Sequence, residues 1–299
     1  MNVFYLLIRL DVWIFRLIQG IVFACVPLPV IKWVIQRELS KSGIALNGRN
    51  KWDIQVSNKK FYRRLANDGN LALGETFMKG WWDCEDLVEL YARLIKAGPR
   101  IPWHIRLRGH MEHIINRQTQ QLSKDSAKKL YDLGNDFFAS FLDKYMNYTC
   151  GYFLNTDDLE EAQINKMNLV ARKLKLKPGM KVLDLGCGAG GMAKYLAENF
   201  GVIVVGYNLS REQCIHARQL CKGLDVEIIQ DDYRNAKGVF DRVICIEMLE
   251  HVGPKNYRSY FEVADRCLTS DGIHLIQCMT RLHKQVQKID RMFLTSWVL

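Results

Sequence analysis

The run KVLDLGCGAGG, residues 181–191, restricts the fold of this chain more than any other stretch. Its apolar half has the pattern of a short strand, and its glycines let the backbone turn tightly and approach a ligand closely. The helix expected after it would offer its N-terminal amides, and Asp184 would accept hydrogen bonds nearby. This pattern predicts an adenosine-type cofactor site at Asp184, Gly186 and Gly188, with a ligand-free glycine turn as the alternative.

The glycine spacing limits which cofactor is expected. It is G-x-G-x-G, which differs from the G-x-G-x-x-G of dinucleotide-binding folds. The position after the second strand, where an acidic residue usually binds the ribose of a dinucleotide, is here Asn208 in GYNLS. The loop therefore favours an adenosine group without deciding which one.

Strand and helix patterns alternate through the second half of the chain. A helical pattern over 159–176 ends before Pro178 and Gly179. The apolar runs of strand type that follow the glycine loop are 202–210, 226–233, 242–250 and 273–280. Alternation at this spacing predicts an α/β fold with a parallel sheet.

Two strand ends carry polar groups suited to a ligand. Asp232 could accept the amino group of an adenine and Tyr233 could stack on the base, although such a pair is more often a helix cap or a turn. Glu250 and His251 follow the next strand, at the edge where open α/β sheets bind ligands. Glu250 could act as a base and His251 could titrate near neutral pH. A capping glutamate and an exposed histidine are the structural alternatives.

Length and cysteine spacing set wider limits. A chain of 299 residues with 48% hydrophobic residues is long enough for two domains, each with its own core. Nine cysteines without a C-x-x-C pair predict neither a metal site nor a disulfide framework. This cysteine usage fits a reducing, cytoplasmic environment.

The N-terminal part is apolar and basic. Residues 1–120 carry 18 Lys and Arg against 10 Asp and Glu, a difference of 8 within a net charge of +10. Charged residues and prolines interrupt residues 1–36, whereas a spanning helix needs about 20 apolar residues. We expect this segment to be an interfacial membrane anchor, with a buried helix, a span or a signal peptide as alternatives. Because no nucleic-acid-binding motif is present, the basic excess favours anionic lipid over nucleic acid.

The polar run INRQTQQLSKDSAKK loses hydrophobic periodicity, so we expect a domain boundary near Gln121. Residues 37–121 would then form a smaller, mainly helical domain. Residues 122–299 would form the α/β domain.

Seven motifs occur in a characteristic order: LGETFMKGWWDCEDL, YDLGNDFF, YTCGYF, LKPGMKVLDLGCGAGG, GYNLSREQ, DDYR and EHVGPKNY. In this order the chain resembles the cyclopropane-fatty-acyl-phospholipid synthases, from about Leu71 to Gln277, and mycolic acid cyclopropane synthases share the later motifs. The resemblance implies an S-adenosylmethionine-dependent methyltransferase domain of Rossmann-like fold, preceded by a lipid-binding domain.

The reaction implied by the resemblance is methylene transfer from S-adenosylmethionine to the cis double bond of an unsaturated phospholipid acyl chain. The catalytic residues it implies are Cys150, Glu250 and Gln277, with YTCGYF as a lid segment and a bicarbonate ion as the base. The cofactor contacts it implies are Tyr148, Thr149, Asp184, Gly186, Gly188, Asn208, Gln213, Asp232 and Tyr233.

Two departures from the family pattern bear on this reaction. Gln277 stands where relatives have a histidine that helps to bind bicarbonate, and a glutamine cannot become cationic. Relatives also continue past the position of Leu299 through a region that completes the sheet. We therefore expect a methyltransferase domain that is truncated at its C-terminus.

Three hypotheses stay open at this point. The first is a cyclopropane synthase that is cytoplasmic, peripheral at the membrane, and acts on phospholipids with unsaturated acyl chains. The second is a catalytically impaired relative that binds lipid and S-adenosylmethionine. The third is a methyltransferase that acts on another lipid or small molecule. A homodimer is compatible with each of them.

Overall fold

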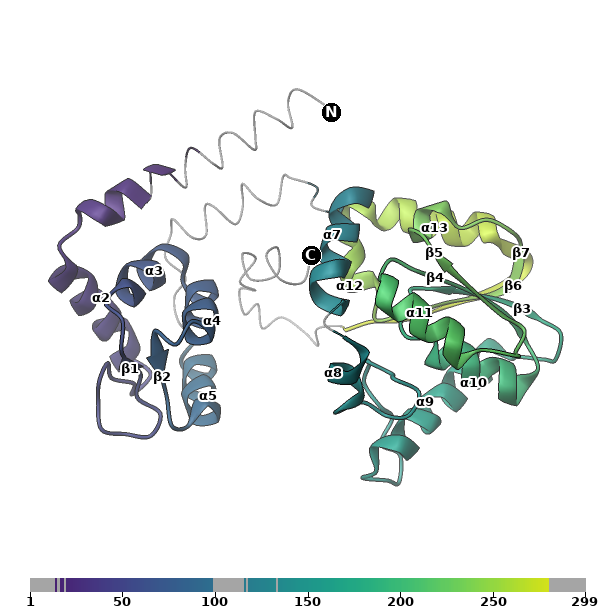
Figure 1. Ribbon diagram of the computed structural model, residues 1–299, viewed down its shortest axis with the longest axis horizontal. Coiled ribbons are helices and arrows are strands. Elements are labelled where there is room, and N and C mark those ends of the chain that lie inside the picture. The colour runs from purple at the N-terminus through teal and green to yellow at the C-terminus, as the bar shows by residue number, and fades with distance from the viewer. Residues whose placement is uncertain are drawn as a thin grey trace. The chain divides into compact units, whose positions relative to one another are not determined.

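The computed structural model describes residues 14, 17, 18, 20–98, 116, 118–132 and 134–279. These residues fall into two compact units, one up to residue 98 and one from residue 116 (Figure 1). The boundary predicted near Gln121 lies close to the start of the second unit. The expected segment 1–36 lies in part outside the described residues, and 280–299 lies wholly outside them.

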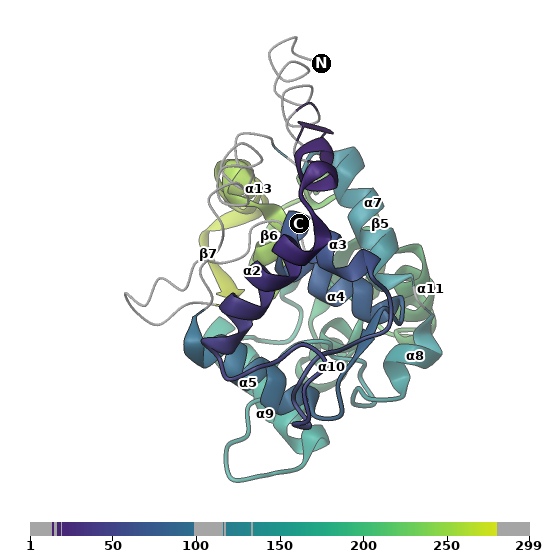
Figure 2. The ribbon, with the colours of Figure 1, turned by 90° about the vertical axis from the view of Figure 1, so that its left-hand side faces the viewer.

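The first unit is mainly helical, as predicted. Its helices are α2 (Leu28–Ser40), α3 (Lys60–Asp68), α4 (Asn70–Met78) and α5 (Leu87–Ala97). The short strands β1 (Gln55–Val56) and β2 (Trp82–Asp83) pair antiparallel. Helix α2 packs beside α3, and α3 beside α4 (Figure 2).

The core of this unit gathers around Trp82. The Trp82 ring lies against Phe61 and Phe77, and its Nε1 donates to the Leu73 carbonyl at 3.0 Å. Helix α2 contributes Ile31 and Ile35 to the same core. Among the described residues, no helix combines the length and the hydropathy needed to cross a bilayer.

The second unit is built on a five-stranded parallel sheet in the order β5-β4-β3-β6-β7. The strands are β3 (Lys181–Leu185), β4 (Ile203–Asn208), β5 (Val226–Gln230), β6 (Phe240–Ile246) and β7 (Leu268–Gln277). The helices are α7 (Gln120–Tyr131), α8 (Asn135–Ala139), α9 (Leu159–Leu174), α10 (Gly191–Phe200), α11 (Arg211–Leu220), α12 (Leu249–Val252) and α13 (Tyr257–Cys267). Two 3₁₀ turns, η1 (Tyr233–Asn235) and η2 (Pro254–Asn256), follow β5 and α12.

Helices cover both faces of this sheet. Val182 of β3 packs into a core with α9 and α10, while its neighbour Leu183 packs into a second core with α13. Successive strand residues point to opposite faces, so a strand buried on both faces is continuously apolar. Figure 1 shows α13 on one side of the sheet and α10 and α11 on the other. The predicted α/β fold is therefore confirmed.

Strand order reverses at β3, which has β4 on one side and β6 on the other. Open α/β sheets bind ligands beside the carboxyl ends of the strands at such a reversal. The glycine run follows β3 directly, so it lies at this position.

The polar run expected to mark a boundary contains most of helix α7, which the sequence analysis missed. Thr119 caps α7 by accepting a hydrogen bond from the Leu122 amide at 3.4 Å. None of the α7 residues is fully buried, so the hydrophobic periodicity that reveals most helices is weak here.

Candidate functional site

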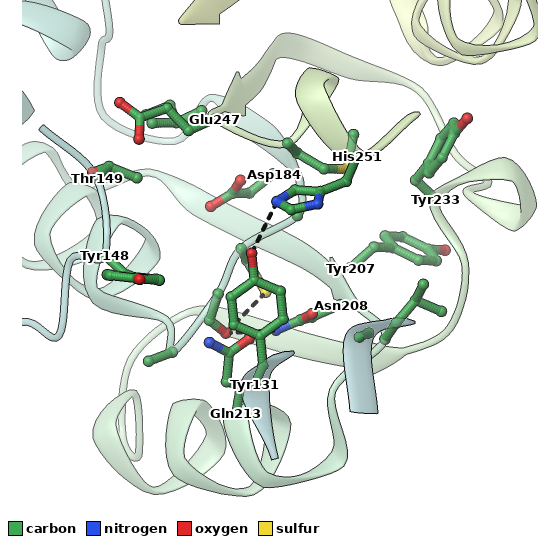
Figure 3. A pocket seen from close by; sticks show the side chains of 18 of the residues that line it. Tyr131, Tyr148, Thr149, Asp184, Tyr207, Asn208, Gln213, Tyr233, Glu247 and His251 are labelled. Carbon is green, nitrogen blue, oxygen red and sulfur yellow. Dashed lines mark hydrogen bonds between the residues drawn. The ribbon is translucent and has the colours of Figure 1, made fainter. Parts of the chain in front are cut away.

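A cavity lies beside the carboxyl ends of β3, β4 and β6 (Figure 3). All nine residues that the resemblance implied as cofactor contacts line it: Tyr148, Thr149, Asp184, Gly186, Gly188, Asn208, Gln213, Asp232 and Tyr233. They come from four separate stretches of chain, so the fold brings them together.

The glycine loop forms one wall of the cavity. Gly186 and Gly188 have φ values of +89° and +54°, in the left-handed region that favours glycine. A Cβ at Gly186 would come within 2.9 Å of Met248, whereas a Cβ at Gly188 would meet no atom within 4 Å. Gly186 is therefore required by packing, while Gly188 keeps open space beside the loop.

The side chain of Asn208 holds this loop in place. Its Nδ2 donates to the Gly188 carbonyl and to Gln213 Oε1, both at 2.9 Å. Gln213 is placed by the start of α11, where its amide donates to the capping Ser210 Oγ at 3.2 Å. Asn208 and Gln213 thus support the loop and line the cavity together.

Asp184 is a buried carboxyl group at the centre of the site, with 3% of its surface exposed. Burial disfavours its charged form and raises its pKa from 3.8 to about 7. Figure 3 shows its side chain among the residues that line the cavity. It would therefore be uncharged in part at neutral pH.

The Asp232 carboxylate is fully buried and forms an ion pair with Arg234. Arg234 Nε donates to Oδ1 at 2.7 Å and Nη2 donates to Oδ2 at 2.9 Å. Asp232 also caps η1, so the capping alternative from the sequence applies, although the residue lines the cavity as well. Arg234 was not selected from the sequence, and it donates further to the Gln118 carbonyl and Ser123 Oγ. It thereby ties the start of α7 to the end of β5.

Helix α9 holds the YTCGYF segment at the cavity. Gln163 Nε2 donates to the Thr149 carbonyl at 2.8 Å, and Lys166 Nζ donates to Thr149 Oγ1. Lys166 is 3% exposed, and desolvation lowers its pKa to about 8 despite the opposing charges of Asp143 and Glu247. The sequence analysis missed Lys166, although a lysine on the buried face of α9, beside Met167 and Val170, is an unusual feature.

A second group of polar side chains lies at the edge of the cavity. Cys150 donates its backbone N–H to Glu247 Oε1 at 3.2 Å. Gln277 Nε2 donates to the same Glu247 oxygen at 3.0 Å and to Cys150 Sγ at 3.4 Å. The structure thus brings the predicted residues Cys150 and Gln277 together, and joins them through Glu247, which the sequence analysis did not select.

Glu250 has other hydrogen-bond partners than this group. Its Oε1 accepts a hydrogen bond from the Met279 amide, while its Oε2 is buried and has no hydrogen-bond partner among the described residues. Glu250 is absent from the residues that line the cavity, whereas Glu247 is among them.

Tyr131 and His251 are two further lining residues that the cofactor prediction omitted. The Tyr131 hydroxyl and His251 Nε2 are hydrogen-bonded at 3.0 Å, as the dashed line in Figure 3 shows. Burial raises the pKa of Tyr131 to about 12, so its hydroxyl keeps its proton at neutral pH. Its motif YDLGNDFF contributed to the resemblance, but nothing in that run indicates that its tyrosine would meet a histidine 120 positions later.

Comparison with known proteins places this chain in a family. Residues 117–299, more than half of the chain, match the family model described as mycolic acid cyclopropane synthetase. The chain belongs to the mycolic acid cyclopropane synthetase family. A related protein is the cyclopropane-fatty-acyl-phospholipid synthase of Escherichia coli K12, which is 45% identical over 80% of this chain. The match covers 63% of the E. coli protein, so this chain spans less than two thirds of its relative.

Further members of the family are similar to about half of this chain. Cyclopropane mycolic acid synthase 1 of Mycobacterium tuberculosis is 39% identical over 51% of this chain and 55% of its own length. The solved structure of the cyclopropane synthase MmaA2 from the same organism superposes with a TM-score of 0.52 and 34% identity, covering 54% of this chain and 59% of MmaA2. The structure of CmaA1, complexed with SAH and CTAB, has a TM-score of 0.50 at 36% identity over 51% and 55% of the two chains. The α/β unit therefore has the methyltransferase fold of this family.

Proposed function

We propose that this protein transfers a methylene group from S-adenosylmethionine to the cis double bond of an unsaturated phospholipid acyl chain. The observation that carries the proposal is the convergence of nine predicted cofactor contacts on one cavity, with Cys150 and Gln277 at its edge. Membership of the family and the similarity to the E. coli phospholipid synthase support the same reaction.

The residues around the cavity fit S-adenosylmethionine. Gly188 leaves open space beside the loop, and Gly190 offers no side chain to cap α10, whose first residues also line the cavity. Asp232 and Tyr233 would hold the adenine, with Arg234 fixing the Asp232 carboxylate. Asp184, Asn208 and Gln213 would contact the remainder. The cofactor supplies an electrophilic methyl group on a positively charged sulfur.

The remaining groups suit the alkene chemistry. The π electrons of the double bond form the new bond to the methyl carbon, while the electron pair of the sulfur–methyl bond stays on sulfur. This leaves a cation on the acyl chain, which the aromatic faces of Tyr131 and Tyr148 would stabilise by roughly 0.5 to 2 kcal/mol each. A base must then remove a proton from the added methyl group so that the ring closes.

The bicarbonate ion that the resemblance implies does not fit the edge of this cavity. Gln277 has two N–H donors, and they are directed to Glu247 Oε1 and Cys150 Sγ. The Cys150 amide is directed to Glu247 as well. These donors already bind the Glu247 carboxylate and the Cys150 sulfur, so they are not available to a bicarbonate ion.

We further propose that the first unit binds lipid and that the protein is peripheral at the cytoplasmic side of a membrane. Several large apolar side chains near its N-terminal helix are exposed, among them Ile21, Val22 and Trp33, with Lys32 and Arg37 nearby. Apolar groups beside basic ones favour the interface of an anionic bilayer.

Expression in bacteria that lack their own cyclopropane synthase tests the proposed reaction. Membrane fatty acids would be analysed by gas chromatography with mass spectrometry, with Cys150→Ala as the comparison. We expect a ring-containing species one methylene heavier than its unsaturated precursor, reduced in the variant. Folded protein without any change in fatty acids would reject the synthase and favour a catalytically impaired relative, and a methylated product without a ring would favour another methyltransferase.

A further inference from the structure

We infer that Glu247 is the general base of this protein, and that its carboxylate takes the place of a free bicarbonate ion. This inference rests on the proposed function. It concerns the last step of that reaction, in which a proton leaves the added methyl group.

The backbone of Glu247 is unusual. Its φ of +49° lies in the left-handed region, which residues with a Cβ rarely adopt and which is found mostly where the surroundings impose it. The Glu247 amide donates to the Gln277 carbonyl at 2.7 Å, which anchors this turn to the end of β7. The strained turn directs the side chain toward the YTCGYF segment, as Figure 3 shows.

The carboxylate is held at its Oε1. That oxygen accepts from the Cys150 amide at 3.2 Å and from Gln277 Nε2 at 3.0 Å. Two donors from distant parts of the chain therefore fix the position of this carboxylate. The Cys150 backbone amide and the Gln277 side-chain amide are not bases, so neither can take the proton from the methyl group. The second oxygen, Oε2, is on the same group and would be the atom that takes the proton.

A buried cation accompanies this carboxylate. Lys166, which lines the same cavity, is close enough for the charge of Glu247 to raise its pKa against the larger effect of burial. The residues that donate hydrogen bonds to the carboxylate, Gln277 and Cys150, are neutral, and burial raises the pKa of the Cys150 thiol. Asp143 acts on Lys166 in the same direction as Glu247, so this cation already has two carboxylates near it, and a free bicarbonate would add a third negative charge.

The step balances without any further reactant. Glu247 removes a proton from the methyl group attached to the cationic acyl chain. The electron pair of the broken C–H bond forms the second C–C bond and closes the three-membered ring. The neutral carboxylic acid then returns its proton to solvent.

The test uses the full chain with S-adenosylmethionine and vesicles of unsaturated phospholipid, in buffers freed of bicarbonate or supplemented with it. We expect the unchanged protein to form cyclopropane lipid at the same rate in both. Glu247→Gln should lower the rate by about 10²-fold or more, the usual contribution of a general base. The control Glu262→Gln, at an exposed position of α13, should leave the rate unchanged.

Chemical rescue separates a base from a structural residue. Glu247→Gly removes the carboxylate and relieves the left-handed strain, so added formate or bicarbonate should raise its rate about tenfold or more. Calorimetric binding of S-adenosylmethionine shows that each variant retains its site.

Three results would overturn the inference and leave the proposed function standing: bicarbonate dependence of the unchanged protein, an undiminished Glu247→Gln, or a Glu247→Gly that no carboxylate rescues while it still binds S-adenosylmethionine. The first needs no variant, so it decides the matter if neither variant folds. An unchanged protein that forms no cyclopropane in either buffer would reject the proposed function, and this inference with it.

Discussion

Replacing Asp184 by asparagine should make the protein more stable at pH 8 and leave its stability nearly unchanged at pH 3.5. Burial raises the pKa of Asp184 from 3.8 to about 7. Between these values the folded state binds a proton that the unfolded chain has released, so the free energy of unfolding falls as the pH rises from about 4 to about 7. Below this interval Asp184 is protonated in both the folded and the unfolded state. Above it the folded state bears the full cost of burying a charged carboxylate. An asparagine side chain would avoid the penalty because it carries no charge.

The size of the effect follows from the same shift. A pKa of about 7 in place of 3.8 corresponds to about 4 kcal/mol at 1.36 kcal/mol per pKa unit. For a unit of this size, such a difference changes Tm by roughly 10 °C. Scanning calorimetry without cofactor, at pH 3.5 and pH 8, measures it, with the exposed Asp157→Asn as the control. If the Asp184→Asn variant and the unchanged protein lose stability in parallel as the pH rises, the burial argument is refuted.

Two further predictions concern the loop and the β5 edge. Gly188→Ala should cost roughly 1 kcal/mol or more of stability because φ is +54°, and should weaken S-adenosylmethionine binding about tenfold or more by calorimetry, because its Cβ would enter open space beside the loop. Gly223→Ala is the control, because Gly223 has a φ of +86° and no atom lies within 4 Å of a Cβ there. It should lower stability without changing the affinity for S-adenosylmethionine. If both variants lose affinity equally, Gly188 does not lie against the cofactor. Arg234→Met should lower the free energy of unfolding by about 3 to 5 kcal/mol in urea, because it leaves the buried Asp232 carboxylate without its cation, and a loss below about 1 kcal/mol would contradict that pairing.

The fold of the second unit could be predicted from local patterns. The helix expected over 159–176 is α9, Leu159–Leu174, and each apolar run predicted as a strand overlaps one. The strands β6 and β7 begin earlier than predicted, at Phe240 and Leu268. These elements are buried in a regular pattern, so their apolar residues recur at a spacing that the sequence reveals. Helix α7 could not be found this way, because it is anchored by single polar contacts such as Arg234 to Ser123 and Tyr131 to His251.

The site residues also divide into those that local patterns predict and those that depend on contacts between distant parts of the chain. Six of the nine cofactor contacts lie at or just after the carboxyl ends of β3, β4 and β5, and parallel strands place these ends at one edge, so their convergence could be expected. The other three, Tyr148, Thr149 and Gln213, were expected only from the resemblance. Glu247 could not be selected, because its role depends on a left-handed backbone and on partners at Cys150 and Gln277 that are distant in sequence. The position after a strand and the resemblance both directed attention to Glu250 instead, whose carboxylate accepts from the Met279 amide. The Glu250 assignment stays a prediction.

The most direct test of the central claim follows the hydrogens of the transferred group. The protein would be incubated with S-adenosylmethionine carrying a fully deuterated methyl group and with vesicles of unsaturated phospholipid, and the fatty acids analysed by mass spectrometry. The account predicts a cyclopropane fatty acid that keeps two of the three deuterons, because the base removes one as the ring closes. A product that keeps all three, or no labelled fatty acid from folded protein that binds the cofactor, would contradict it.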